Sequence, residues 1–317
     1  MDKMIFIFSM PKSGSTLLQR IVSTSDRVST LPETWILLPM FYMLRKNGLY
    51  SEFSGRQLHK ALRNNILNTG NKNTYFKSVG EFYKTLIKGL SEDPNKEFFL
   101  EKTPRYSLLY REIMSTFNDG HFLVLTRNPL MIMSSMMNTY SGGYYNLFRF
   151  SIDLKEVFYS ISEVLKDNNE NILHVRYEDL VSDTENVVKQ IGGYLGINLL
   201  DSWRLFNEID LSGLVGDPVG TIKYKTISKQ NSSFEGIPLN WVRKAILIRH
   251  LKVMGRGNIA LQGYNYDELV WQVKSSKFTL NYFISDIFLY LFGILFCVFD
   301  FVPLLNKFKS KRFYPSW

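Results

Sequence analysis

Residues 9–17, with the sequence SMPKSGSTL, have the composition of an anion-binding loop. They join an apolar run to a helical pattern, and the backbone N–H groups of a helix N-terminus attract negative charge. The loop is not a Walker A sequence, because Lys12 precedes Gly14 by two positions. A tight turn of small residues has a similar composition. We favour an anion site made by the backbone N–H groups around Gly14, by Lys12 and by the hydroxyls of Ser13, Ser15 and Thr16.

Two later motifs offer further contacts to a nucleotide. Arg127 lies in LTRNP, and a guanidinium can bind a phosphate through two hydrogen bonds. Ser135 follows in the next helical pattern and could reach the same phosphate. Tyr177 lies in RYEDL and offers a flat ring to a base. Taken singly, these are an ordinary surface arginine and a half-buried tyrosine. Together with the first loop, they suggest a nucleotide with phosphates at both ends.

The elements that must position these residues form an α/β pattern. Four short apolar runs predict buried parallel strands at 4–9, 98–101, 121–126 and 172–176. Helical patterns lie between and after them, at 15–25, 33–45, 55–68, 79–90, 106–117, 130–140, 154–166, 183–195 and 238–254. This alternation predicts a P-loop-like parallel sheet with helices on both faces. Ligands of such sheets bind beyond the carboxyl ends of the strands, where all three motifs fall.

Bulk properties narrow the class of protein. The 317 residues carry a formal net charge of +9, which suits an anionic ligand or an anionic surface. The aromatic residues do not alternate with a basic stripe, so we predict no nucleic-acid binding. A single cysteine, Cys297, and no histidine pairs at ligand spacing predict no metal site. The N-terminal residues do not have the pattern of a signal peptide, so we expect a cytoplasmic protein.

The motifs, taken in order, resemble those of sulfotransferases that use 3′-phosphoadenosine 5′-phosphosulfate (PAPS). PKSGST followed by Leu17 resembles their 5′-phosphosulfate loop. TRNP, with Ser135 eight residues after Arg127, resembles their 3′-phosphate site, and RYEDL resembles the segment beside adenine. The resemblance spans roughly residues 4–264. It implies that PAPS donates a sulfuryl group to an acceptor hydroxyl without a metal.

The resemblance also assigns catalytic residues. The cytosolic phenol and steroid sulfotransferases carry a histidine where this chain has Pro104. Carbohydrate and protein-tyrosine sulfotransferases instead use a glutamate after the first helix, which implies Glu33 as the base. Lys12 and Lys102 are then expected to stabilise charge on the leaving and transferring groups. The competing interpretations are a helix-capping carboxylate for Glu33 and a solvated lysine for Lys102. Residues 221–234 are expected to close over the nucleotide. The four histidines, at positions 59, 121, 174 and 250, are expected to be structural.

The C-terminal residues have a different character. We predict a catalytic domain over residues 1–275 and a hydrophobic helical extension with a basic tail over 276–317. Between Phe278 and Leu305 the only charged residues are Asp286 and Asp300. The uncharged stretch from Ile287 to Phe299 has 13 residues, fewer than the ~20 needed to span a bilayer. We expect this segment to dock on the cytosolic face of an anionic membrane, with its aspartates on one acidic stripe. Spanning the membrane and packing on the domain are the alternatives.

Three functions therefore follow from the sequence. The first is a sulfotransferase acting on a saccharide or glycolipid. The second is a nucleotide-dependent kinase, which would require Mg²⁺ and prefer ATP. The third is a membrane-associated protein that binds PAPS without turnover. The combination of Lys12, Glu33, Lys102 and Arg127 favours the first.

Overall fold

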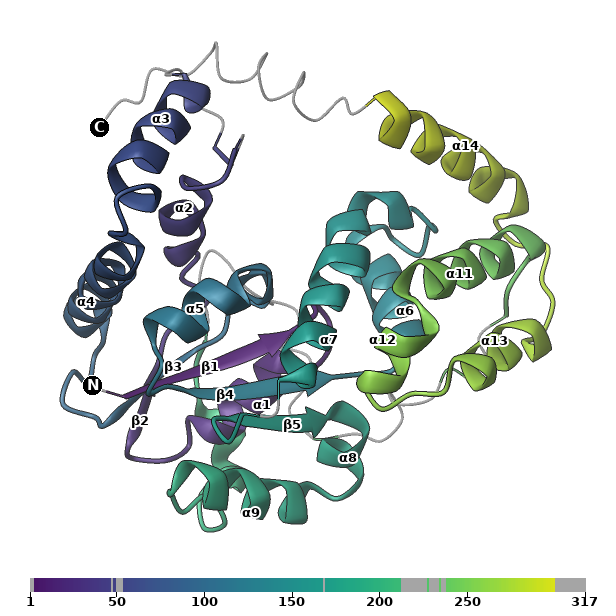
Figure 1. Ribbon diagram of the computed structural model, residues 1–317. Coiled ribbons are helices and arrows are strands. Elements are labelled where there is room, and N and C mark those ends of the chain that lie inside the picture. Colours follow the sequence, from purple (N-terminus) through teal and green to yellow (C-terminus); the bar gives the residue numbers. More distant parts are fainter. Residues whose placement is uncertain are drawn as a thin grey trace.

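The computed structural model contains one parallel sheet of five strands, in the order β2-β3-β1-β4-β5 (Figure 1). The strands are β1 (Lys3–Ser9), β2 (Val28–Thr30), β3 (Phe98–Glu101), β4 (His121–Thr126) and β5 (Ile172–Arg176). The structure describes residues 3–46, 48–49, 54–167, 169–211, 227, 234 and 238–299. The predicted α/β fold is confirmed, and β3, β4 and β5 have the predicted bounds. The sequence did not predict β2, because three residues carry too little periodicity.

Helices cover both faces of the sheet, which explains why the strands are apolar throughout. Alternate residues of β1 point to opposite sides: Phe6 and Phe8 join one core, and Ile5 and Ile7 join the other. Residues of α1 (Ser15–Val22), α8 (Tyr177–Ser182) and α9 (Thr184–Leu195) complete the isoleucine side. The phenylalanine side is covered by α4 (Lys72–Leu90), α5 (Tyr110–Thr116), α6 (Pro129–Tyr140), α7 (Phe158–Lys166) and α11 (Trp241–Met254).

The predicted helix over 33–45 is mostly wrong. Only α2 (Leu37–Tyr42) forms there, and Glu33 lies before it in non-helical chain. Trp35 has a φ of 57°, in the left-handed region, which interrupts any right-handed helix at that point. Glu33 is therefore not in the first turn of a helix, and the helix-capping interpretation does not apply to it.

Some of the other helical segments divide a predicted helix into two, as over 55–67, some lie where no helix was predicted, as over 256–261 and 266–275, and one lies in the predicted C-terminal extension. They are α3 (Gly55–Leu62), η1 (Arg63–Leu67), η2 (Pro104–Leu109), η3 (Leu147–Phe150), η4 (Ile152–Val157), η5 (Trp203–Glu208), α12 (Arg256–Leu261), α13 (Tyr266–Ser275) and α14 (Phe283–Phe299). Figure 1 shows α14 beyond α11, away from the sheet. No helix within the described ranges is both long enough and apolar enough to cross a membrane.

A buried ion pair holds α14 against α11. Asp286 is fully buried, and its carboxylate accepts hydrogen bonds from Arg243 Nε and Asn240 Nδ2, each at 2.6 Å. The expectation that Asp286 lies on an exposed acidic stripe is therefore wrong, because α11 supplies a cation to it. Asp300 lies outside the described residues. The division of the chain at residue 275 stays a prediction.

Candidate active site

The loop between β1 and α1 has the backbone of an anion-binding turn. Lys12 and Gly14 both have positive φ, 65° and 95°. Gly14 is the N-cap of α1, and no side chain caps this helix end. A Cβ at Gly14 would lie 2.3 Å from the ring of Tyr177, so a larger residue would displace the ring. The residues present therefore fit a bound phosphosulfate, with backbone N–H groups and Lys12 as the donors.

The three nucleotide motifs of the sequence meet at this loop. Arg127, just beyond β4, is 7% exposed, and its Nη1 donates to the carbonyl oxygen of Lys12 at 2.8 Å. The Arg127 guanidinium carbon lies 4.3 Å from the centre of the Tyr177 ring. Tyr177 is thus buried between Gly14 and Arg127, where it supports the loop. Its predicted contact with a base stays a prediction, as does the phosphate contact of Ser135, which is half-buried in α6.

Glu178 joins two of these motifs, a role that the sequence analysis missed. One carboxylate oxygen accepts from the backbone N–H of Asn128 at 2.9 Å, and the other accepts from the Tyr264 hydroxyl at 2.6 Å. Burial and the Glu178 carboxylate raise the pKa of Tyr264, so its hydroxyl keeps its proton. Glu178 therefore fixes the turn that presents Arg127. The acidic pair of RYEDL was the only signal of this in the sequence.

Glu33 and Lys102 form an ion pair at the carboxyl end of β3. Lys102 Nζ lies 2.9 Å from Glu33 Oε1, and their side chains are 4% and 11% exposed. The other carboxylate oxygen of Glu33 accepts from Trp35 Nε1 at 3.1 Å. The structure thus brings together two of the three residues that the resemblance assigned to catalysis. The interpretation of Lys102 as a solvated lysine is wrong, because its side chain is buried.

A second buried carboxylate, Glu101, holds this region in place. It is 2% exposed and accepts hydrogen bonds from Thr34 at 3.0 Å, from Thr103 at 2.8 Å and from Tyr83. Burial raises the pKa of Glu101. Tyr106 extends the network, since its hydroxyl bonds with Thr34 at 2.9 Å. The segment carrying Glu33 is therefore fastened to the end of β3.

The two parts of the site lie on neighbouring strands. β1 and β3 are paired in the sheet, and a hydrogen bond of 3.0 Å joins the Ser9 N–H to the Ser107 hydroxyl in η2. Helix α1 also holds the chain leading to Glu33, because Gln19 Nε2 donates to the Leu31 carbonyl at 2.9 Å. A buried acid–base pair thus lies beside a loop suited to an anion. This arrangement can deprotonate a hydroxyl and stabilise developing negative charge.

The histidines occupy structural settings. His174 Nε2 bonds to the Thr126 hydroxyl at 2.8 Å, and His121 packs edge-on against Tyr194. His59 Nδ1 lies 3.1 Å from the Leu44 carbonyl, and His250 packs against Phe148. Within the described ranges, no cluster of three or more His, Cys, Asp or Glu residues could hold a metal. The loop expected to close over the nucleotide has five polar residues that lie outside the described residues: Lys223, Lys225, Ser228, Lys229 and Ser232.

Comparisons with known proteins point to one family. A family model described as "Sulfotransferase family" matches residues 4–201. Nodulation protein NoeE of Sinorhizobium fredii (strain NBRC 101917 / NGR234) is 23% identical over 146 residues, which are 43% of this chain and 31% of that protein. This chain therefore matches less than a third of that relative's length.

Two solved structures share the fold. The sulfotransferase domain from the Synechococcus PCC 7002 olefin synthase has a TM-score of 0.52 and 22% identity, covering 80% of this chain and 93% of that chain. The sulfotransferase domain from the curacin biosynthetic pathway has a TM-score of 0.51 and 20% identity, covering 73% and 89%. At identities this low, the similarity to these two structures shows a shared fold and nothing more specific.

Proposed function

This chain belongs to the sulfotransferase family, and from that premise we propose that it transfers a sulfuryl group from PAPS to an acceptor hydroxyl. The observation that carries the proposal is the contact of three motifs at one sheet edge. Arg127 bonds to the loop of Lys12 and stacks on Tyr177, and the Glu33–Lys102 pair lies at the carboxyl end of the adjoining strand. The kinase alternative has no comparable support, since the loop lacks the Walker A lysine position.

The donor-binding residues divide between its two anionic ends. PAPS supplies a sulfuryl group attached to a good leaving phosphate. The loop of Lys12 and the N-terminus of α1 bind the 5′-phosphosulfate, where positive charge stabilises the leaving oxygen. Arg127 and Ser135 bind the 3′-phosphate. Lys12 and Arg127 neutralise the negative charge of the leaving nucleotide, so the proposed reaction needs no metal.

Glu33 takes the proton of the acceptor hydroxyl. Its two oxygens already accept from Lys102 and Trp35. A carboxylate has about four acceptor positions, so these contacts leave room for the acceptor. Lys102 orients the carboxylate and stabilises charge on the group in transfer. Glu33 in this position, and Pro104 where phenol-specific enzymes carry histidine, favour a saccharide or glycolipid acceptor.

We also propose that the enzyme is peripheral to an anionic membrane. Helix α14 has an exposed apolar face. Five large side chains at spacings that share one side of a helix are each at least half exposed: Ile284, Phe288, Leu291, Phe292 and Leu295. The basic residues of the tail, Lys307, Lys309, Lys311 and Arg312, follow in the sequence. An apolar helix face followed by cations suits a surface of anionic lipids.

The test of the catalytic proposal is turnover with radiolabelled PAPS against glycans, glycolipids and tyrosine peptides. We expect label to reach a hydroxyl acceptor at an undiminished rate in EDTA.

Glu33→Gln should lower kcat by on the order of 10²–10⁴ and leave nucleotide affinity unchanged, because glutamine keeps the size and loses the basicity. Glu185→Gln, on the exposed surface of α9, is the control. Metal-dependent turnover with ATP would support the kinase instead, and PAPS binding without any turnover would support a silent binding protein.

A further inference from the structure

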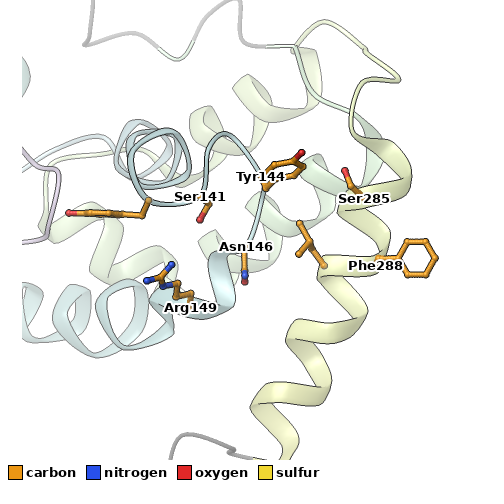
Figure 2. Close-up of a pocket in the computed structure, with 8 residues that line it drawn as sticks. Ser141, Tyr144, Asn146, Arg149, Ser285 and Phe288 are labelled. Atoms are coloured by element: carbon orange, nitrogen blue, oxygen red, sulfur yellow. The ribbon is translucent and has the colours of Figure 1, made fainter. Parts of the chain in front are cut away.

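A cavity of about 570 Å³ lies between the end of α6, the loop that follows it, and α14 (Figure 2). Its loop side is polar, with Ser141, Asn146 and Arg149. The other lining residues are Tyr144 from the loop, and Ser285, Phe288 and Leu289 from α14. In Figure 2 the Phe288 ring points away from the loop, so Leu289 is the more relevant apolar side chain of α14. The cavity therefore combines polar groups, most of them on its loop side, with apolar surface from Tyr144 and Leu289.

Arg243 of α11 fixes both walls of this cavity. Its guanidinium is paired with Asp286 of α14, and its Nη2 donates to the Gly143 carbonyl of the loop at 3.2 Å. Farther along α14, the Phe148 ring packs so closely on Gly293 that a Cβ there would lie 2.1 Å from it. Contacts of this kind connect the two walls of the cavity, which is open to solvent.

The cavity adjoins the candidate active site through one side chain. Tyr140, the last residue of α6, lines the cavity, and its ring centre lies 4.9 Å from Lys12 Nζ. Lys12 is the cation assigned to the phosphosulfate end of the donor. A ligand that extends from the cavity past Tyr140 would therefore approach Lys12.

We infer that this cavity binds the acceptor, and that the acceptor is an amphiphile with a hydroxyl-bearing polar group and an alkyl chain. This inference rests on the proposed sulfuryl transfer. Ser141, Asn146 and Arg149 provide hydrogen-bond donors for the polar group near Tyr140. Leu289 and Tyr144 contact the chain, so α14 forms part of the acceptor site.

Binding of alkyl glucosides tests the cavity without depending on turnover. The probes are methyl and octyl β-glucoside, below the micelle-forming concentration, added to protein saturated with the desulfated nucleotide. Each methylene that becomes buried should strengthen binding by up to about fourfold. We expect octyl glucoside to bind at least tenfold more tightly than methyl glucoside. Equal affinities for the two probes would overturn the inference.

A matched pair of leucines locates the site. Leu289→Asn should reduce the octyl preference to less than about threefold, because it places an amide against the chain. Leu291→Asn should leave the preference unchanged, because this leucine is 53% exposed on the same helix and does not line the cavity. Equal losses in both variants would show adsorption to the outer face of α14 and contradict the inference. If Leu289→Asn fails to fold, Leu289→Ala with unchanged nucleotide affinity takes its place, and it should lower the octyl preference while Leu291→Ala does not, because it removes apolar contact with the chain.

Competition then separates this inference from the proposed function. Octyl glucoside should raise the KM of an acceptor found by the turnover screen and leave kcat unchanged. Non-competitive inhibition would overturn the acceptor role while sulfuryl transfer still stood. Absence of any sulfuryl transfer, with octyl glucoside bound at Leu289, would refute the proposed function and with it the acceptor role, but would leave the amphiphile site.

Discussion

Lys12 and Arg127 carry the charge that a nucleotide would meet, and the structure links them directly. Lys12→Ala should weaken binding of the desulfated nucleotide, because a charge-assisted contact of roughly 1.5–3 kcal/mol is lost. Arg127→Ala should weaken it further, since the guanidinium also supports the Lys12 loop through its carbonyl. Calorimetry measures both, with Lys189→Ala on the exposed side of α9 as the control. Unchanged affinity in the two variants would remove both residues from the site.

Glu101 should act on turnover through Glu33, without contact to the substrate. Its carboxylate accepts three hydroxyl hydrogen bonds, one of them from Thr34, the neighbour of Glu33. A glutamine has a single acceptor oxygen, so Glu101→Gln forces some of these hydroxyls to reorient. We expect kcat to fall roughly tenfold and the pH–rate profile to shift, since misplacing a catalytic group costs rate. Nucleotide affinity should stay the same.

A purely structural role for Glu101 would give a different result. Glu101→Gln would then lower the free energy of unfolding and leave kcat and the pH–rate profile of the folded fraction unchanged. Thr103→Val removes one hydroxyl bond to the same carboxylate and leaves Thr34 in place. It is therefore the matched variant, and it should change kcat less than Glu101→Gln.

At the scale of elements, the sequence predicted the buried strands, whose positions are determined by hydrophobic burial. The strands 98–101, 121–126 and 172–176 have their predicted bounds because strands covered on both faces are short, continuous apolar runs. The predicted helix over 33–45 failed because backbone conformation at Trp35, not polarity, decides that segment. The Glu101 network was missed for a related reason. Its partners lie up to 67 residues away in sequence, and no local pattern joins them.

Helix α11 carries a histidine that should make the protein sensitive to mild acid. Burial, and secondarily the neighbouring Arg249, lowers the pKa of His250 to about 4 from its ordinary 6.5. Below pH 6.5 the unfolded chain binds a proton here and the folded chain does not. Stability should therefore fall between pH 6.5 and 4, by roughly 1.4 kcal/mol per unit and about 3 kcal/mol in all.

The measurement is urea unfolding at several pH values in the wild type and in His250→Gln. The variant lacks this titration, so its stability should fall less as the pH is lowered. His121 and His174 also have lowered pKa values and contribute a loss of the same sign, but they are present in both proteins. Parallel curves for the two proteins would contradict the assignment.

At the scale of the whole molecule, the sheet brings distant residues to one edge. Lys12, Lys102, Arg127 and Tyr177 follow four different strands, and pairing of those strands places them together. This convergence could be predicted, because it follows from parallel topology alone. The position of α14 could not. The sequence places Asp286 on an exposed stripe, because its partner, Arg243, lies 43 residues earlier and has no distinguishing pattern around it.

The buried pair also decides how the membrane proposal should be tested. Truncation after Lys277 would remove Asp286, the ion-pair partner of Arg243, together with the whole of α14, which packs on α11. Lost membrane binding in a truncated protein could then reflect damage to the domain. A triple variant that combines Ile284→Ser, Phe292→Ser and Leu295→Ser avoids damage to the domain, because all three side chains are more than half exposed. This variant keeps both Asp286 and Leu289.

We expect the wild-type protein to float with vesicles containing phosphatidylserine and the triple serine variant to stay behind, because its apolar face is lost. Replacing the four basic tail residues with glutamine should weaken flotation by about 1 kcal/mol for each charge, and added salt should weaken it in the wild type. Nucleotide affinity should be the same in all these proteins. A wild-type protein that never floats, or a triple variant that floats as well as the wild type, would refute membrane docking by α14. The octyl glucoside preference at Leu289 would then describe a site for free amphiphiles, because Leu289 lines the cavity and none of the three substituted residues does.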